Sequence, residues 1–199
     1  ITLLGTGGDT GNDNRGVLID GGNALVSTNG AGMVSIVGNG GDGNDAVGVV
    51  LLDGRVSAET GTLDVMGIGG PNGERNRGIR VAGGKIDTTS GVITLNGTAG
   101  DGSGDSLTGV LLSDADISTA MGEISVDGTA SVAADDETSD HHGVRVVNGS
   151  LLEVTGTGVG IDITGTGGDG AGANIVNGSH GILILDSDVM VDAGFLTLN

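Results

Sequence analysis

One strand motif recurs along the whole chain and constrains its fold more than any other feature. The motif is [ILV]-x-[ILV]-x-G, and its complete copies start at Ile1, Val34, Leu63, Ile93, Ile124 and Ile161. A seventh copy of the strand starts at Leu196 and stops one residue before the Gly position. A second motif, G-[VI]-x-[VIL], follows each of the first six copies, and a third short alternating segment comes a few residues later. Each repeat of about 30 residues therefore holds three short strands separated by Gly-rich turns, and no segment has helical periodicity.

Strands this short cannot bury an apolar face alone. Stacking each strand on its copy in the next repeat buries a continuous apolar column. The fold class that we expect is therefore all-β: a single-stranded parallel β-helix with three strands per coil and about six coils, forming one domain over residues 1–199. Successive coils should rise by one strand spacing of ~4.8 Å.

Alternation within the strands predicts which side chains point inward. In the first strand of a repeat, Ile93 and Leu95 should point inward and Thr94 outward. In the second strand, Val110 and Leu112 should point inward. We expect an aliphatic core, because the chain has one Phe and no Trp or Tyr.

Glycine ends the first strand of every complete repeat. The column consists of Gly5, Gly38, Gly67, Gly97, Gly128 and Gly165. It predicts a corner that needs either a positive φ or a close approach of two backbone segments. The 44 Gly residues follow no strict G-X-Y period, which excludes collagen, and the aliphatic content argues against a disordered linker.

The turn between the first and second strands is rich in Asp and Gly. Its copy "GGDGNDAVG", residues 40–48, matches the nonapeptide that binds Ca²⁺ in RTX β-rolls, but a β-roll repeats that nonapeptide in tandem. Stacking still aligns carboxylates across coils, and Ca²⁺ takes about 6–8 oxygen ligands. The candidate calcium ligands are Asp9, Asp13, Asp42, Asp45, Asp101, Asp105 and Asp169. The alternative is that these residues only form turns, and Pro71 interrupts their column.

The fifth and sixth repeats have the longest such turns, and these hold the histidines. His142 and His180 each precede the Gly of the second motif, so they should lie in adjacent coils. Longer loops are where repeat proteins carry binding function. The candidate binding residues are Asp135, Asp136, Asp140, His142 and His180. A solvated turn is the alternative, since no fixed spacing of ligands supports a transition metal.

Aliphatic side chains also alternate outward on the second strand. The candidates for lateral packing are Leu18, Val50, Leu52, Leu111, Leu183 and Leu185. A contiguous stripe would suggest packing against a partner or another copy of the chain. Scattered exposed aliphatics would need no explanation.

The charge balance limits the partners. Seven Lys and Arg stand against 26 Asp and Glu, which gives a net charge of −19. This argues against nucleic acid and anionic lipid, and no apolar run reaches the ~20 residues of a membrane span. Divalent cations and the glycans of a host surface or matrix are compatible with it.

Catalysis has little support in the sequence. A β-helix enzyme that cleaves acidic polysaccharides would need basic residues beside carboxylates, and the seven Lys and Arg are spread over four columns. No Ser/His/Asp arrangement can be argued from the three histidines. We expect no enzyme activity and no required cofactor, with a carbohydrate-active β-helix enzyme as the alternative.

An ice-binding solenoid is less supported, because the outward column of the first strand mixes Thr, Ser and Asp with one such residue per strand.

The segments "ITGTGGDGAG…HGILI" and "GVITLNGTAGDGSGD…TGVLL" resemble the repeats of large secreted bacterial exoproteins, the filamentous-haemagglutinin-like and autotransporter-like adhesins. The resemblance covers the whole chain. It implies a right-handed β-helix, export to the cell surface or medium, and a stalk-like or adhesive role. It carries over no catalytic or binding residue.

The chain begins and stops on the first strand of a coil, at Ile1 and Leu196. Solenoids usually end in atypical polar repeats that cap the exposed strand edges. We therefore expect the parent structure to continue past both ends. It would do so as further coils of a longer polypeptide or by head-to-tail stacking of copies.

Overall fold

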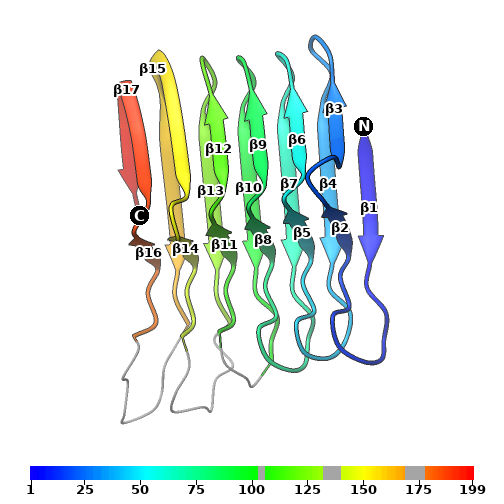
Figure 1. Cartoon of the computed structure of the whole chain (residues 1–199). Coiled ribbons are helices and arrows are strands. Elements are labelled where there is room, and N and C mark those ends of the chain that lie inside the picture. Colours follow the sequence, from blue (N-terminus) through cyan, green and yellow to red (C-terminus); the bar gives the residue numbers. More distant parts are fainter. Residues whose placement is uncertain (103–105, 132–139, 169–177) are drawn as a thin grey trace.

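The computed structural model describes residues 1–102, 106–131, 140–168 and 178–199. The chain is a parallel β-solenoid of about six turns of ~31 residues. The described residues contain no helix. The coils stack along one axis, with the two ends of the chain at opposite ends of the stack (Figure 1). The predicted fold class, an all-β parallel solenoid, is confirmed.

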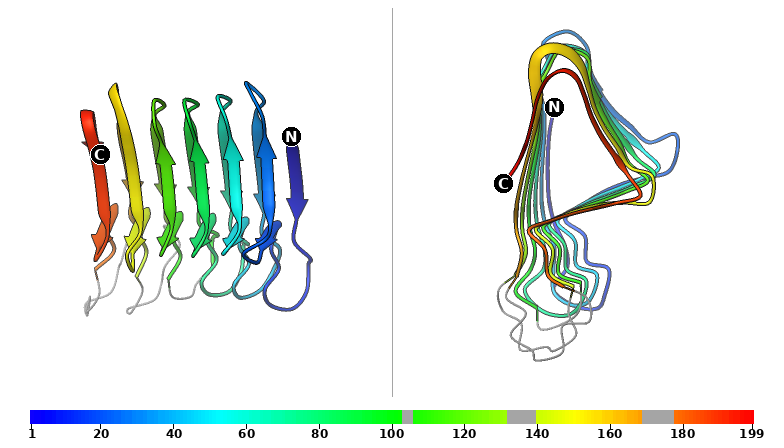
Figure 2. Two further views of the ribbon diagram at one scale, coloured as in Figure 1. Left: turned by 45° about the horizontal axis from the view of Figure 1, so that its top comes forward. Right: turned by 90° about the vertical axis from the view of Figure 1, so that its left-hand side faces the viewer.

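Each coil has three walls, which enclose a triangular cross-section (Figure 2). The first wall contains β1 (Thr2–Thr6), β4 (Val34–Asn39), β7 (Leu63–Ile68), β10 (Ile93–Thr98) and β13 (Ile124–Thr129). The second wall contains β2 (Val17–Asp20), β5 (Val49–Leu52), β8 (Ile79–Ala82), β11 (Val110–Ser113), β14 (Val144–Val147) and β16 (Ile182–Leu185). The third wall contains β3 (Leu25–Thr28), β6 (Arg55–Ala58), β9 (Lys85–Thr88) and β12 (Asp116–Thr119).

Two long strands complete the first and third walls. β15 (Leu151–Thr166) and β17 (Asp188–Leu198) each run from the third wall of one coil into the first wall of the next. The first and third walls therefore form one 11-stranded sheet, and the second wall forms a separate six-stranded sheet.

Neighbouring strands pair in parallel and in the register that the repeats predict. Ile93 pairs with Leu63 on one side and with Ile124 on the other. In the same strands, Gly97 lies between Gly67 and Gly128. Residues at equivalent positions of successive coils thus form straight columns along the axis.

The interior is the aliphatic core that alternation predicts. The side chains of Ile93, Leu95, Val110 and Leu112 are all fully buried. Fully burying one such side chain contributes roughly 1.5–3 kcal/mol relative to leaving it exposed. The columns that these residues form run continuously through the middle coils, so the same packing is repeated from coil to coil.

Two glycine columns form a neck beside the core. In the described residues, the turns that join the first wall to the second project beyond the triangle (Figure 2). We call residues 7–15 and their described equivalents in later coils the turn lobe. A Cβ on Gly97 would lie 2.2 Å from the carbonyl oxygen of Gly109, and a Cβ on Gly109 would lie 2.4 Å from the backbone nitrogen of Thr129. The φ of Gly97 is not positive. The glycine column therefore serves the close backbone approach, which is one of the two predicted reasons for it.

Positive φ values occur instead in the turn lobe, at Asp13, Asp45 and Arg75, and at the corner between the second and third walls. Asp53, Asp114, Asn148 and Asp186 have φ values of 49–58°. Asp and Asn tolerate this left-handed conformation better than most residues because their side chains bond locally. This corner, unlike the neck, has room for a side chain.

Candidate functional site

The turn lobe carries the aspartates that were predicted to bind calcium. Backbone hydrogen bonds between coils place Asp9 beside Asp42 and Asp13 beside Asp45. In the third coil, Arg75 takes the position that Asp13 and Asp45 hold in the first two. A basic residue therefore interrupts this column of carboxylates.

Arginines bind two of these carboxylates. Arg75 donates to Asp45 at 2.7 Å, and Arg77 Nη1 lies 3.7 Å from the same carboxylate. Arg15 donates to Asp13 at 2.8 Å. The hydrogen bond from Arg75 holds the pKa of Asp45 below its ordinary value. These carboxylates thus have protein partners.

The other predicted calcium ligands are placed as follows. Asp42 accepts hydrogen bonds from its neighbour Gly43 at 2.8 Å and from Asn72 at 2.9 Å. Asp101 lines a shallow hollow beside Pro71. Asp105 and Asp169 lie outside the described residues. No group of three or more His, Cys, Asp or Glu within the described ranges could hold a metal ion, and calcium binding stays a prediction.

His142 and His180 lie in adjacent coils, as their positions predict. Their ring centroids are 5.2 Å apart, and the His180 backbone nitrogen donates to Nδ1 of His142 at 3.2 Å. Burial, with Arg145 as the next cause, lowers the pKa of His142 to about 4, although Asp140 acts in the opposite direction. The His142 ring is therefore neutral at pH 7. Two predicted binding residues, Asp135 and Asp136, lie outside the described residues.

The outward face of the second wall carries the residues that were predicted to pack laterally. Their exposure falls from Leu185 (52 %) and Leu18 (44 %) through half-buried Leu52, Leu111 and Leu183 to fully buried Val50. Val50 lies between Leu18 and Arg80 in its column. The exposed aliphatics therefore form no unbroken stripe, because Val50 offers no surface and charged side chains interrupt the column.

The same face gathers most of the positive charge. Five of the seven Lys and Arg residues lie on the second wall or in the adjoining turn lobe: Arg15, Arg75, Arg77, Arg80 and Arg145. Arg80 and Arg145 stand in one column with Leu111 between them. The sequence places these basic residues in separate columns and therefore does not predict that most of them lie on one face. The available signal was the pair Arg77 and Arg80, which lie three residues apart on either side of the neck glycine Gly78.

We call Arg77, Arg80 and Arg145 the basic cluster. The Arg77 side chain is only 12 % exposed. Burial, together with the charge of Arg80, lowers the pKa of Arg77 to about 10, and Arg75 and Arg145 act in the same direction. Nε of Arg77 and Nε of Arg145 are buried without a hydrogen-bond partner among the residues described. Arg80 and Arg145 likewise make no ion pair within that part of the chain.

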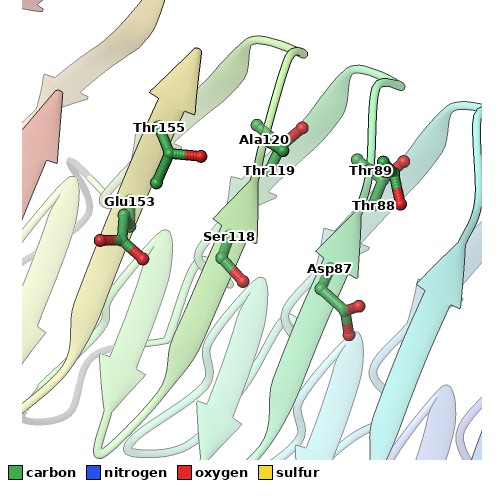
Figure 3. A pocket seen from close by; sticks show the side chains of 8 residues that line it. All are labelled: Asp87, Thr88, Thr89, Ser118, Thr119, Ala120, Glu153 and Thr155. Carbon is green, nitrogen blue, oxygen red and sulfur yellow. The ribbon is translucent and has the colours of Figure 1, made fainter. Parts of the chain in front are cut away.

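The third wall has a different outward surface. An open groove runs along it, lined by carboxylates and hydroxyls from three neighbouring coils (Figure 3). Asp87, Ser118 and Glu153 form one outward column in this groove. Arg55 holds Asp87 through two hydrogen bonds of 2.6 Å. One of the two carboxylates in the groove is thus already ion-paired.

The outward face of the first wall corrects one assumption from the sequence. β10 continues one residue past Gly97, so Thr94, Asn96 and Thr98 all face outward. The assumption of one outward polar residue per strand is therefore wrong. An ice-binding surface is still not favoured, because Asp64 lies between Ser35 and Thr94 and so interrupts the hydroxyl column.

No protein family, curated protein or solved structure matches the chain in sequence or structure comparisons. Within the described ranges there is no helix long and apolar enough to cross a membrane. The chain is accordingly characterised by its fold: a parallel β-solenoid of about six turns.

Proposed function

We propose that the chain is a structural, non-catalytic segment of a bacterial adhesin or surface fibre that works outside the cell. The observation that supports this most is the repetition of one coil. Successive coils place polar groups at the same outward position, as in the column of Asp87, Ser118 and Glu153. Such groups are spread along the axis, whereas a catalytic centre needs them to converge on one reacting atom.

The extracellular part of this proposal can be tested on intact cells. An antibody raised against residues 1–199 should label intact source cells or detect the protein in the medium. Labelling that appears only after the cells are permeabilised would overturn it. A cytoplasmic protein, assayed in parallel on the same cells, controls for leakage.

The competing function is a carbohydrate-active enzyme, and the groove of Figure 3 is the observation that favours it. Asp87 and Glu153 lie two coils apart in the same column, so their backbones are about 9.6 Å apart. Two carboxylates separated by roughly 6.5–9.5 Å are the arrangement of inverting glycosidases. However, both carboxylate oxygens of Asp87 already accept hydrogen bonds of 2.6 Å from Arg55, so neither oxygen is free for a substrate.

Turnover of polysaccharides separates the two functions. We expect no new reducing ends and no unsaturated uronate when the chain is incubated with neutral and uronate-containing polysaccharides. Cleavage that disappears in an Asp87→Asn, Glu153→Gln double variant would establish the enzyme and overturn the non-catalytic role. Circular dichroism of the double variant controls for loss of the fold.

A further inference from the structure

We propose that Arg77, Arg80 and Arg145 bind a small oxyanion, which is the sulfate, phosphate or carboxylate group of a low-molecular-weight ligand. Arg80 and Arg145 lie two coils apart in one outward column of the second wall, and Arg77 lies in the adjoining turn lobe, two residues before β8. This inference concerns a face other than the groove of Figure 3, and it does not depend on the adhesive role.

The coil does not need these arginines. The position of Arg77 is held by Val47 in the preceding coil and by Thr108 in the following one. Between Arg80 and Arg145, the same column carries Leu111. The coils on either side of Arg77 and the coil between Arg80 and Arg145 therefore build this wall without arginine, although Arg15 and His142 hold the Arg77 position in the first and fifth coils.

The basic cluster lacks enough negative charge among its described neighbours. Asp45 is the only carboxylate ion-paired with Arg77 in the described part of the chain, and Arg75 already binds it at 2.7 Å. Asp140, near His142, is the other described carboxylate that acts on this region. A buried charge without a partner is costly, and Nε of Arg77 and Nε of Arg145 are buried donors without an acceptor among the described residues. A bound anion would supply the missing negative charge to Arg80 and Arg145, whose side chains are only half-buried.

The chemistry of the donors defines the class of ligand. A guanidinium presents planar paired N–H donors that match the oxygens of carboxylate, sulfate and phosphate groups. Arg80 and Arg145 are two coils apart, so their backbones are about 9.6 Å apart, and their long side chains can reach a common ligand from both sides. The net charge of −19 opposes a long polyanion, which favours a small ligand.

Titration with inorganic sulfate, inorganic phosphate and acetate tests the site. Melting temperature and calorimetric binding should be measured at fixed ionic strength, with chloride as the reference salt. We expect at least one of these anions to bind saturably at millimolar concentration and to raise the melting temperature, because a ligand of the folded state stabilises it. Tighter binding of sulfate or phosphate than of acetate would identify the ligand group as a tetrahedral oxyanion, and the reverse order would identify it as a carboxylate. General salting-out by sulfate is not saturable.

The repeats supply conservative variants for this test. Arg80→Leu and Arg145→Leu introduce the residue that Leu111 already provides in their column, and Arg77→Val introduces the residue found in the preceding coil. Each should weaken anion binding at least tenfold while the chain stays folded. Arg55→Leu, on the third wall, is the matched control and should bind like the wild type. Absence of saturable binding of all three anions would overturn the site, as would equal binding by the Arg80→Leu and Arg145→Leu variants.

Discussion

The second and third walls both carry basic side chains on their outward faces, but they differ in whether these side chains have ion-pair partners. On the third wall, Arg55 pairs with Asp87 at 2.6 Å and Lys85 pairs with Asp116 at 2.5 Å, each partner lying in the next coil. On the second wall, Arg80 and Arg145 have no ion-pair partner among the described residues. The third-wall ion pairs therefore link neighbouring coils, whereas Arg80 and Arg145 form no such link among the described residues.

The neck sets the position of the second wall, and breaking it should give the largest effect. Gly97→Ala would place a Cβ 2.2 Å from the carbonyl oxygen of Gly109, which forces the backbone to move. We expect the free energy of unfolding to fall by about 3 kcal/mol, as measured by urea denaturation. Gly22→Ala is the control, because its nearest atom would be 4.0 Å away. Equal stability of the two variants would show that the neck tolerates a side chain.

Acid should act on the second wall through His142. The pKa of His142 is lowered to about 4 in the folded chain from an ordinary value of 6.5. Above pH 6.5 the ring is neutral in both states. As the pH falls from 6.5 to 4, only the unfolded chain takes up the proton, so stability should fall by on the order of 2 kcal/mol.

His142→Thr isolates this contribution, because Thr108 holds the same position in the preceding coil. The variant should show a smaller loss of stability across that pH window in urea denaturation. The third wall has no histidine, so no imidazole on that wall contributes to the pH dependence of stability in this range. An unchanged pH dependence in the variant would contradict the assignment to His142.

Removing a buried second-wall charge should stabilise the chain. Arg77 is 12 % exposed, and replacing a poorly compensated buried charge with an apolar residue is often stabilising. We expect Arg77→Val to raise the free energy of unfolding by about 1 kcal/mol in buffer that contains only chloride. A decrease in stability would mean that Arg77 has a favourable structural role.

Removing a third-wall charge should have the smallest effect and the opposite sign. Arg55 is half exposed, and exposed ion pairs contribute little, so Arg55→Leu should cost about 0.5 kcal/mol. The difference from wild type should shrink at high salt, because salt screens an exposed pair. A loss that is independent of salt would point to packing rather than to the ion pair with Asp87.

The sequence predicts the fold well because strand alternation and repeat spacing act locally. The inward positions of Ile93 and Leu95 and the column of Gly97 follow directly from the motif. The burial of Val50 could not be predicted in the same way, because alternation places it outward and says nothing about what covers that face. The positive φ of Asp53 was not predicted, because only glycine was considered for this conformation. Asp also tolerates it.

The candidate sites were harder to predict than the fold. The proximity of His142 and His180 follows from the repeat. The pairing of Asp45 with Arg75 was missed, although counting one repeat forward from Asp45 leads to Arg75. The isolation of Arg80 and Arg145 depends on which carboxylates lie nearby in space, and the columns alone do not give that information.

The contrast between the two walls is tested most directly by the urea midpoints of two double variants in chloride buffer. One variant is Arg80→Leu with Arg145→Leu on the second wall, and the other is Arg55→Leu with Lys85→Leu on the third. We expect the midpoint to rise above wild type in the first variant and to fall below it in the second, with equal denaturant dependence in both. A fall in the first variant as large as that in the second would contradict the claim that the second-wall arginines are not needed for the fold.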